Sequence, residues 1–175
     1  MRRMPLRCVV DTNVATTANR MNPGAPATCV AASARALQDV MKRGHLFLDQ
    51  GRKIVEEYWR HLHAKGEPGP GDAFFRWVLQ EEWVGARVTR VPITAKSSDP
   101  DDFEELPSRP GGGSYDPSDR KFLAVSAAHA EHPPILQAFD SKWVGWQADL
   151  AKTGVRIHFL CPAEIKAKYA EKMAR

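Results

Sequence analysis

The stretch LRCVVDTN, residues 6–13, begins as a short apolar run and changes abruptly to polar residues. Its β-branched valines and its polar stop predict a short buried strand. Asp11 is the first polar residue after this run, and we therefore expect its carboxylate at the carboxyl end of the strand. In a parallel sheet, the crevice beyond the carboxyl ends of the strands is where ligands bind.

Working outward from this stretch, strand-like and helix-like segments alternate along the chain. Apolar runs predict further strands at residues 45–48, 87–93, 135–139 and 155–160. Helical spacing of apolar residues predicts helices at 26–42, 54–62, 74–79, 116–129, 143–150 and 162–173. Strands separated by helices require crossovers. The sequence thus predicts the α/β class, with a central, mostly parallel sheet and helices on both faces.

Length and composition indicate one ordinary globular domain spanning residues 1–175. Apolar residues make up 43% of the chain and charged residues 26%, which argues against wholesale disorder. Apolar runs are far shorter than the roughly 20 residues that cross a bilayer, so no membrane contact is expected. Residues 94–115 show no periodicity and are predicted to form a mobile loop.

Cysteine usage and the N-terminus suggest a compartment. The three cysteines are odd in number, widely spaced and without a C-x-x-C pair, so neither a disulfide framework nor a zinc knuckle is expected. Cys8 and Cys161 are interpreted as buried thiols. No apolar signal core follows the N-terminal arginines, which predicts a cytoplasmic location. A formal charge of +4 permits nucleic-acid binding without identifying a partner.

Several carboxylates are expected at one edge of this sheet. Asp11 and Asp140 each follow a predicted strand, and Asp116 and Asp119 lie three residues apart at the start of a predicted helix. Glu57 lies on a helix whose apolar face would turn it inward. Carboxylates that converge without cations repel one another, and a divalent metal offsets this cost. Oxygen-only ligands favour Mg²⁺ or Mn²⁺.

Such a metal activates water and stabilises the charge that develops on a phosphoryl group, so the implied reaction is phosphodiester hydrolysis. The same carboxylates can also have purely structural roles. Each aspartate can be a helix cap, and Glu57 can be a solvated charge paired with Lys53 or Arg60. Glu56 competes with Glu57 for one role, as Asp116 competes with Asp119.

Four blocks of the chain resemble the PIN domains, a family of compact α/β metal-dependent nucleases that act mostly on RNA. They are CVVDTNV at residues 8–14, IVEEY at 54–58, DPSDRKF at 116–122 and AFDSKW at 138–143. The resemblance implies a metal site lined by Asp11, Glu57, Asp119 and Asp140, with Thr12 or Asn13 and Ser141 assisting. It also implies an endoribonuclease, a toxin role with an antitoxin protein as partner, and a homodimer.

Polar and basic residues near these acids are candidates for contact with the RNA substrate: Asn13, Ser141, Arg120, Lys121 and Lys142. A solvated charged face is the alternative for the basic side chains. Two other functions compete with the nuclease. One is a nucleic-acid-binding or scaffold protein that keeps the fold without turnover, and the other is a phosphoacceptor domain in which a strand-end aspartate is phosphorylated.

Overall fold

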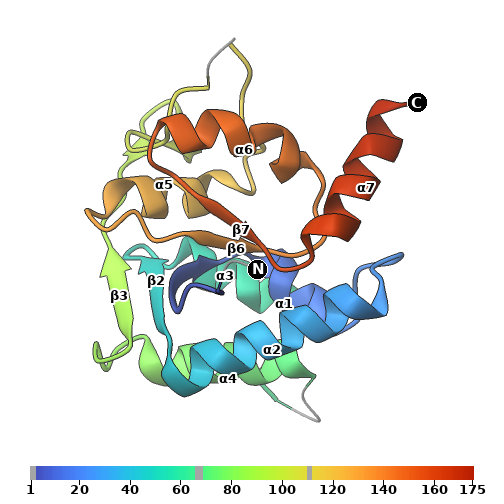
Figure 1. Ribbon diagram of the computed structural model, residues 1–175. Helices are drawn as coiled ribbons and strands as arrows, with labels where there is room; N and C mark the ends of the chain where they lie inside the picture. The colour runs from blue at the N-terminus through green and yellow to red at the C-terminus, as the bar shows by residue number, and fades with distance from the viewer. Residues whose placement is uncertain (1–2, 66–68, 110–111) are drawn as a thin grey trace.

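A five-stranded, all-parallel sheet forms the centre of the computed structural model, which describes residues 3–65, 69–109 and 112–175 (Figure 1). Its strands follow the order β3-β2-β1-β6-β7. Their bounds are β1 Arg7–Val10, β2 His45–Asp49, β3 Val88–Val91, β6 Ile135–Gln137 and β7 Ile157–Phe159. The predicted parallel α/β sheet is confirmed, with the strand at 87–93 at one edge.

The strand order changes direction between β1 and β6. From β1 the chain proceeds to β2 and β3 on one side, while β6 and β7 lie on the other. Val10 is paired in register with Leu136, so the two strands end side by side. A crevice outside the carboxyl ends of strands is expected at such a switch point. Asp11 and Asp140 follow the two strands that border it.

Helices cover both faces of the sheet (Figure 1). In this view α5 and α6 lie above the sheet, and α2 and α4 lie below it. The helices are α1 Thr12–Ala18, α2 Ala27–Arg43, α3 Lys53–His61, α4 Pro70–Glu81, α5 Arg120–Ala128, α6 Lys142–Lys152 and α7 Pro162–Met173. Among the described residues, no helix is long and apolar enough to cross a membrane.

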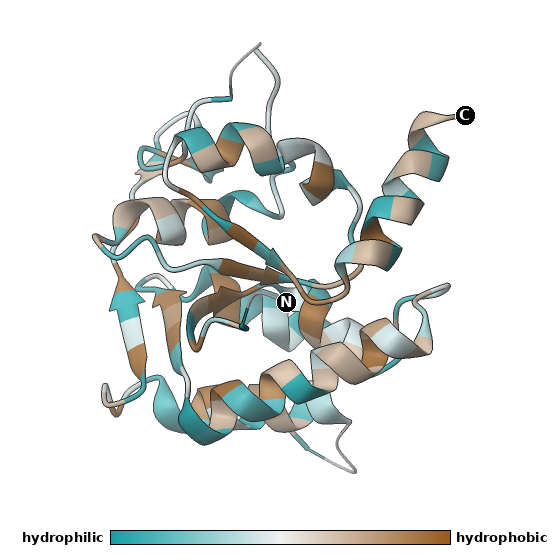
Figure 2. Cartoon of the chain, viewed as in Figure 1, coloured by the Kyte–Doolittle hydropathy of each residue, from teal (hydrophilic) through white to brown (hydrophobic). Residues whose placement is uncertain are grey.

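The core lies between the sheet and these helices, and apolar residues are concentrated in the strands (Figure 2). Cys8, Val9 and Val10 of β1 are all fully buried, as expected for a central strand with helices on both faces. Trp143 and Phe122 bring large side chains to the same core from α6 and α5. Both residues therefore belong to the hydrophobic core.

The segment 94–115 contains regular structure that its sequence does not suggest. Strands β4 (Ala95–Lys96) and β5 (Asp99–Phe103) form an antiparallel hairpin that packs against α5. Phe103 anchors the hairpin because its ring is buried. The prediction that this segment lacks regular structure is wrong for the hairpin, and residues 110 and 111 of the predicted loop lie outside the described residues.

The prediction for the cysteines is wrong in one respect. Cys29 and Cys161 form a disulfide, whereas Cys8 is a buried free thiol as expected. The bond joins the first turn of α2 to the residue that precedes α7, across a separation of 132 residues. Because disulfides are rare in the cytosol, the redox state of this pair tests the predicted cytoplasmic location.

Candidate functional site

Asp11 lies in a pocket of about 270 Å³ at the carboxyl ends of β1 and β6. It directly follows β1, and its side chain caps α1 by accepting a hydrogen bond from Asn13 N at 2.6 Å through Oδ1. The other oxygen, Oδ2, is buried and has no hydrogen-bond partner among the described residues. The alternative that Asp11 is a helix cap is therefore met, yet the cap uses only one oxygen of the carboxylate.

Asn13 links two segments that line this pocket. Its side-chain oxygen Oδ1 accepts a hydrogen bond of 2.7 Å from the backbone N–H of Phe139, just before Asp140. The start of α1 is thus joined to the loop that follows β6, which holds the two strand-end aspartates near each other. Asn13 lines the pocket as predicted for a substrate contact, and its hydrogen bonds also make it a positioning residue.

Asp119 and Asp140 enter the pocket from the start of α5 and from the loop that follows β6. One ammonium group pairs with both: Lys142 Nζ lies 2.6 Å from Asp119 Oδ2 and 3.3 Å from Asp140 Oδ2. It also lies 3.0 Å from Asp116 Oδ2. Asp119 is buried whereas Asp116 is exposed and lies outside the pocket lining. The structure therefore brings Asp119 into the pocket and leaves Asp116 at the rim.

Glu57 reaches the pocket from α3, while its neighbour Glu56 is exposed. The orientation follows from the packing of Tyr58, whose ring is buried and whose hydroxyl donates a hydrogen bond of 2.5 Å to Val10 O. Glu57 is ion-paired with Lys121 of α5. His61 lines the pocket one helical turn further along the same face as Glu57.

Asp49, at the end of β2, sets where α3 begins. Its two carboxylate oxygens accept hydrogen bonds from Lys53 N at 2.7 Å and from Ile54 N at 2.8 Å. N–H groups in the first turn of a helix have no partner within the helix, and the buried Asp49 carboxylate supplies one for both of these. Asp49 is thus a positioning residue for Glu57, although its sequence context predicts only a turn.

We expect Asp49→Ala to lower the free energy of unfolding by about 1–2 kcal/mol, the usual cost of losing a helix cap. Urea denaturation measures this change. Asp39→Ala is the matched control, because Asp39 makes only an exposed ion pair with Arg43 on α2. Equal stability of the two variants would show that the Asp49 cap does not hold α3 in place.

The acids of the pocket disturb one another's ionisation. The pKa of Asp11 is raised well above its usual value, chiefly by burial and then by the charges of Asp119, Glu57 and Asp140. Burial likewise raises the pKa of Asp119 to about 7, although the hydrogen bond from Lys142 opposes it. The charges of the other three predicted ligands thus act on the pKa of Asp11, which places the four carboxylates close enough to interact.

This raised pKa predicts how stability depends on pH. The folded protein keeps a proton on Asp119 up to about pH 7, whereas the unfolded chain releases it near pH 4. In chelator-treated protein, the free energy of unfolding should fall as the pH rises through this window. Thermal unfolding measured across this pH window should show a smaller decrease in stability for Asp119→Asn than for the wild type. The same pH dependence in both proteins would contradict the raised pKa of Asp119.

The other predicted substrate contacts occupy different positions. Arg120 donates hydrogen bonds to Asp99 Oδ2 and to Tyr115 O, and it does not line the pocket. Ser141 is buried at the start of α6, also outside the pocket lining. Lys121 and Lys142 pair with the acids described above. Their contact with an RNA phosphate stays a prediction.

Several pocket residues are missed by the sequence reasoning, and they come mainly from α1 and the segment that follows it. They are Thr16, Met21, Asn22, His61 and Ser118. Asn22 donates hydrogen bonds to Thr17 Oγ1 and to Asn13 O. The buried positions of the seven-residue helix α1 are mostly alanine and threonine, which give little hydrophobic periodicity, so no clear signal in the sequence identifies this wall of the pocket.

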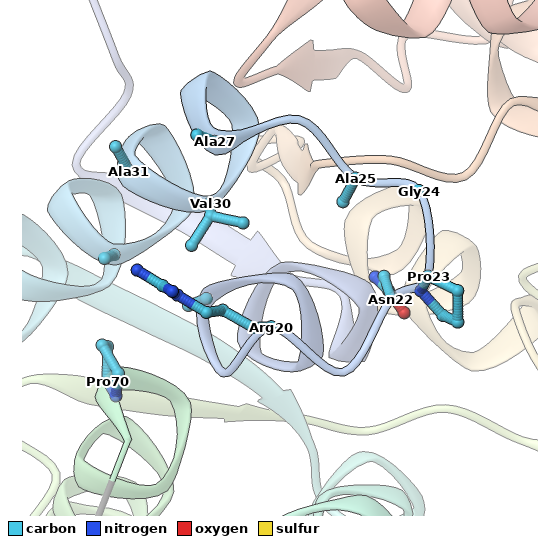
Figure 3. Close-up of a pocket in the computed structure, with 11 residues that line it drawn as sticks. Arg20, Asn22, Pro23, Gly24, Ala25, Ala27, Val30, Ala31 and Pro70 are labelled. Carbon is cyan, nitrogen blue, oxygen red and sulfur yellow. The ribbon is translucent and has the colours of Figure 1, made fainter.

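A larger groove of about 830 Å³ adjoins this site between α1, α2 and the start of α4 (Figure 3). Small apolar side chains line it, and Arg20 lies between Val30 and Pro70. Asn22 lines both hollows. The groove has no carboxylate in its lining, so the acid chemistry belongs to the smaller pocket.

The smaller pocket suits a hard divalent cation in its donor types. Asp11 Oδ2 and Thr12 Oγ1 are buried oxygens without hydrogen-bond partners, and Glu57, Asp119 and Asp140 add carboxylates. Among the described residues, no three of these carboxylates have oxygens within 4.8 Å of one another. Lys142 Nζ lies among them instead. Cys29, Cys161 and Glu164 do meet that distance, but their sulfurs are joined in the disulfide.

No family model, curated protein or solved structure matches this chain.

Proposed function

We propose that this protein is a metal-dependent endoribonuclease of the PIN type. The observation that carries the proposal is the convergence of Asp11, Glu57, Asp119 and Asp140 on one pocket at the switch point of a parallel sheet. These residues come from four separate parts of the chain. Burial of an unpartnered Asp11 oxygen beside other acids is costly unless a cation binds there.

In this proposal Asp11, Glu57, Asp119 and Asp140 hold Mg²⁺ or Mn²⁺. The bound ion supplies a polarised water and stabilises the negative charge that develops on the phosphoryl group. Asn13 holds Asp11 Oδ1 through its backbone N–H and holds the residue before Asp140 through its side chain, which leaves Asp11 Oδ2 available to the ion. Lys142 lies at the pocket lining, where its ammonium group can also attract a phosphate.

RNA cleavage in the presence of metal tests the proposal. The purified protein is incubated with single-stranded RNA labelled at one end, in Mn²⁺, in Mg²⁺ and in excess chelator, and the products are resolved on a denaturing gel. We expect internal cleavage that requires the metal. RNA binding without cleavage under all three conditions would instead support the nucleic-acid-binding alternative.

A toxin role in the cytoplasm, with an antitoxin protein as partner and a homodimeric assembly, remains part of the proposal because the PIN resemblance implies it. Induced expression in bacterial cells should arrest growth, and Asp11→Asn should relieve the arrest. Arrest that persists in this variant would separate toxicity from the acidic pocket.

A further inference from the structure

Lys142 occupies an unusual position among the carboxylates. It is the first residue of α6, and its ammonium group lies within 3.3 Å of oxygens of Asp116, Asp119 and Asp140. Its contact with Asp116 is a hydrogen bond, and its contacts with Asp119 and Asp140 are ion pairs. Lys142 is therefore held inside the acidic cluster by a set of carboxylates that includes two of the proposed metal ligands.

The positions of the neighbouring charges set how much positive charge the pocket can accept. Five carboxylates, those of Asp11, Glu57, Asp116, Asp119 and Asp140, lie with two ammonium groups, those of Lys121 and Lys142. The formal charge of the cluster is therefore about minus three when all groups are ionised. One divalent ion leaves it slightly negative, whereas two would make it positive.

The contacts divide the pocket into two parts. Asp119 and Asp140 each form an ion pair with Lys142, whereas Asp11 forms no ion pair among the described residues. The Oδ2 atoms of Asp11 and Asp119 are both buried without a hydrogen-bond partner there, so only Asp11 lacks a nearby cation. In two-metal sites the ions lie roughly 4 Å apart and share bridging carboxylates. An ammonium group 2.6 Å from the Asp119 carboxylate lies where a second ion would have to bind.

We infer that Lys142 takes the place of a second metal ion, so that the pocket binds one divalent cation. This inference rests on the proposed metal site and specifies its occupancy. The single ion is needed on the Asp11 side, where no other cation contacts the carboxylate. The ammonium group of Lys142 then neutralises part of the charge of Asp119 and Asp140. It excludes a second ion because it lies beside both carboxylates and repels a like charge.

Counting bound Mn²⁺ tests the inference without relying on catalysis. Free Mn²⁺ is measured by electron paramagnetic resonance while the metal is titrated into the full-length protein. We expect one ion per chain for the wild type and two for Lys142→Met, which keeps an unbranched side chain but removes the charge. Lys142→Arg retains the charge and should still bind one ion.

Lys152→Met is the matched control, because Lys152 ends the same helix and pairs with Asp149, away from the pocket lining. It should bind one ion. Thermal unfolding confirms that each variant is folded, and the wild-type count remains decisive if Lys142→Met does not fold. Two ions in the wild type, or one in folded Lys142→Met, would overturn the inference while leaving the proposed nuclease intact. No bound Mn²⁺ in the wild type would overturn both.

Discussion

Asp11→Asn should lower metal-dependent RNA cleavage by at least about a hundredfold, since even the loss of a residue that only supports a metal ligand costs 10–100-fold. The substitution should leave the fold intact. An asparagine oxygen can accept the hydrogen bond that Asn13 N now donates to Asp11 Oδ1. It also removes a carboxylate whose pKa is raised by burial and by three neighbouring acids, so unfolding of the metal-free protein should require no less free energy.

Initial cleavage rates and thermal unfolding, measured on the same preparations, check both parts of this expectation. Asp39→Asn is the matched control because Asp39 lies on α2, outside the pocket, and it should cleave RNA at the wild-type rate. Cleavage by Asp11→Asn at more than a tenth of the wild-type rate in saturating Mn²⁺ would contradict the role given to Asp11.

Removing the disulfide should have the largest effect on stability. Cys29 and Cys161 close a loop with a sequence separation of 132, and loss of a native disulfide typically costs about 2–5 kcal/mol. We therefore expect the double variant Cys29→Ser and Cys161→Ser to unfold at a much lower urea concentration than the oxidised wild type. The acidic pocket contains neither cysteine, so RNA cleavage at low temperature should be retained.

Equilibrium urea unfolding of the oxidised wild type, the reduced wild type and the double variant measures this contribution. The reduced wild type should resemble the double variant because both lack the cross-link. If the free energy of unfolding of the double variant lies within about 0.5 kcal/mol of that of the oxidised wild type, the bond does not stabilise the fold, because neutral surface changes have effects of this size.

The sheet could be predicted from the sequence because its strands carry local signals. Val9 and Val10 form part of a continuous apolar run, as is typical of a strand buried on both faces. The hairpin at 95–103 lacks this signal, since its strands are mainly polar and only Phe103 reaches the interior. The Cys29–Cys161 pair depends on the tertiary packing of α2 and α7, which spacing along the chain does not reveal.

The candidate site was accessible to sequence reasoning where a carboxylate follows a strand or begins a helix. Asp11, Asp119 and Asp140 have such positions, and the pocket contains all three. The ion pairs of Lys121 and Lys142 with these acids and Glu57 could not be predicted, because they depend on side-chain directions from α5 and α6. The capping role of Asp49 is local, because its hydrogen bonds reach only Lys53 and Ile54, but a turn sequence does not show which side chain will accept them.

The most direct measurement is the anomalous scattering of Mn²⁺ in crystals of the wild-type protein soaked in manganese. If these side chains bind a hard cation together, a strong peak will lie among the carboxylates of Asp11, Glu57, Asp119 and Asp140. A pocket without manganese, in crystals whose carboxylates are ionised and open to solvent, would contradict the metal-dependent nuclease.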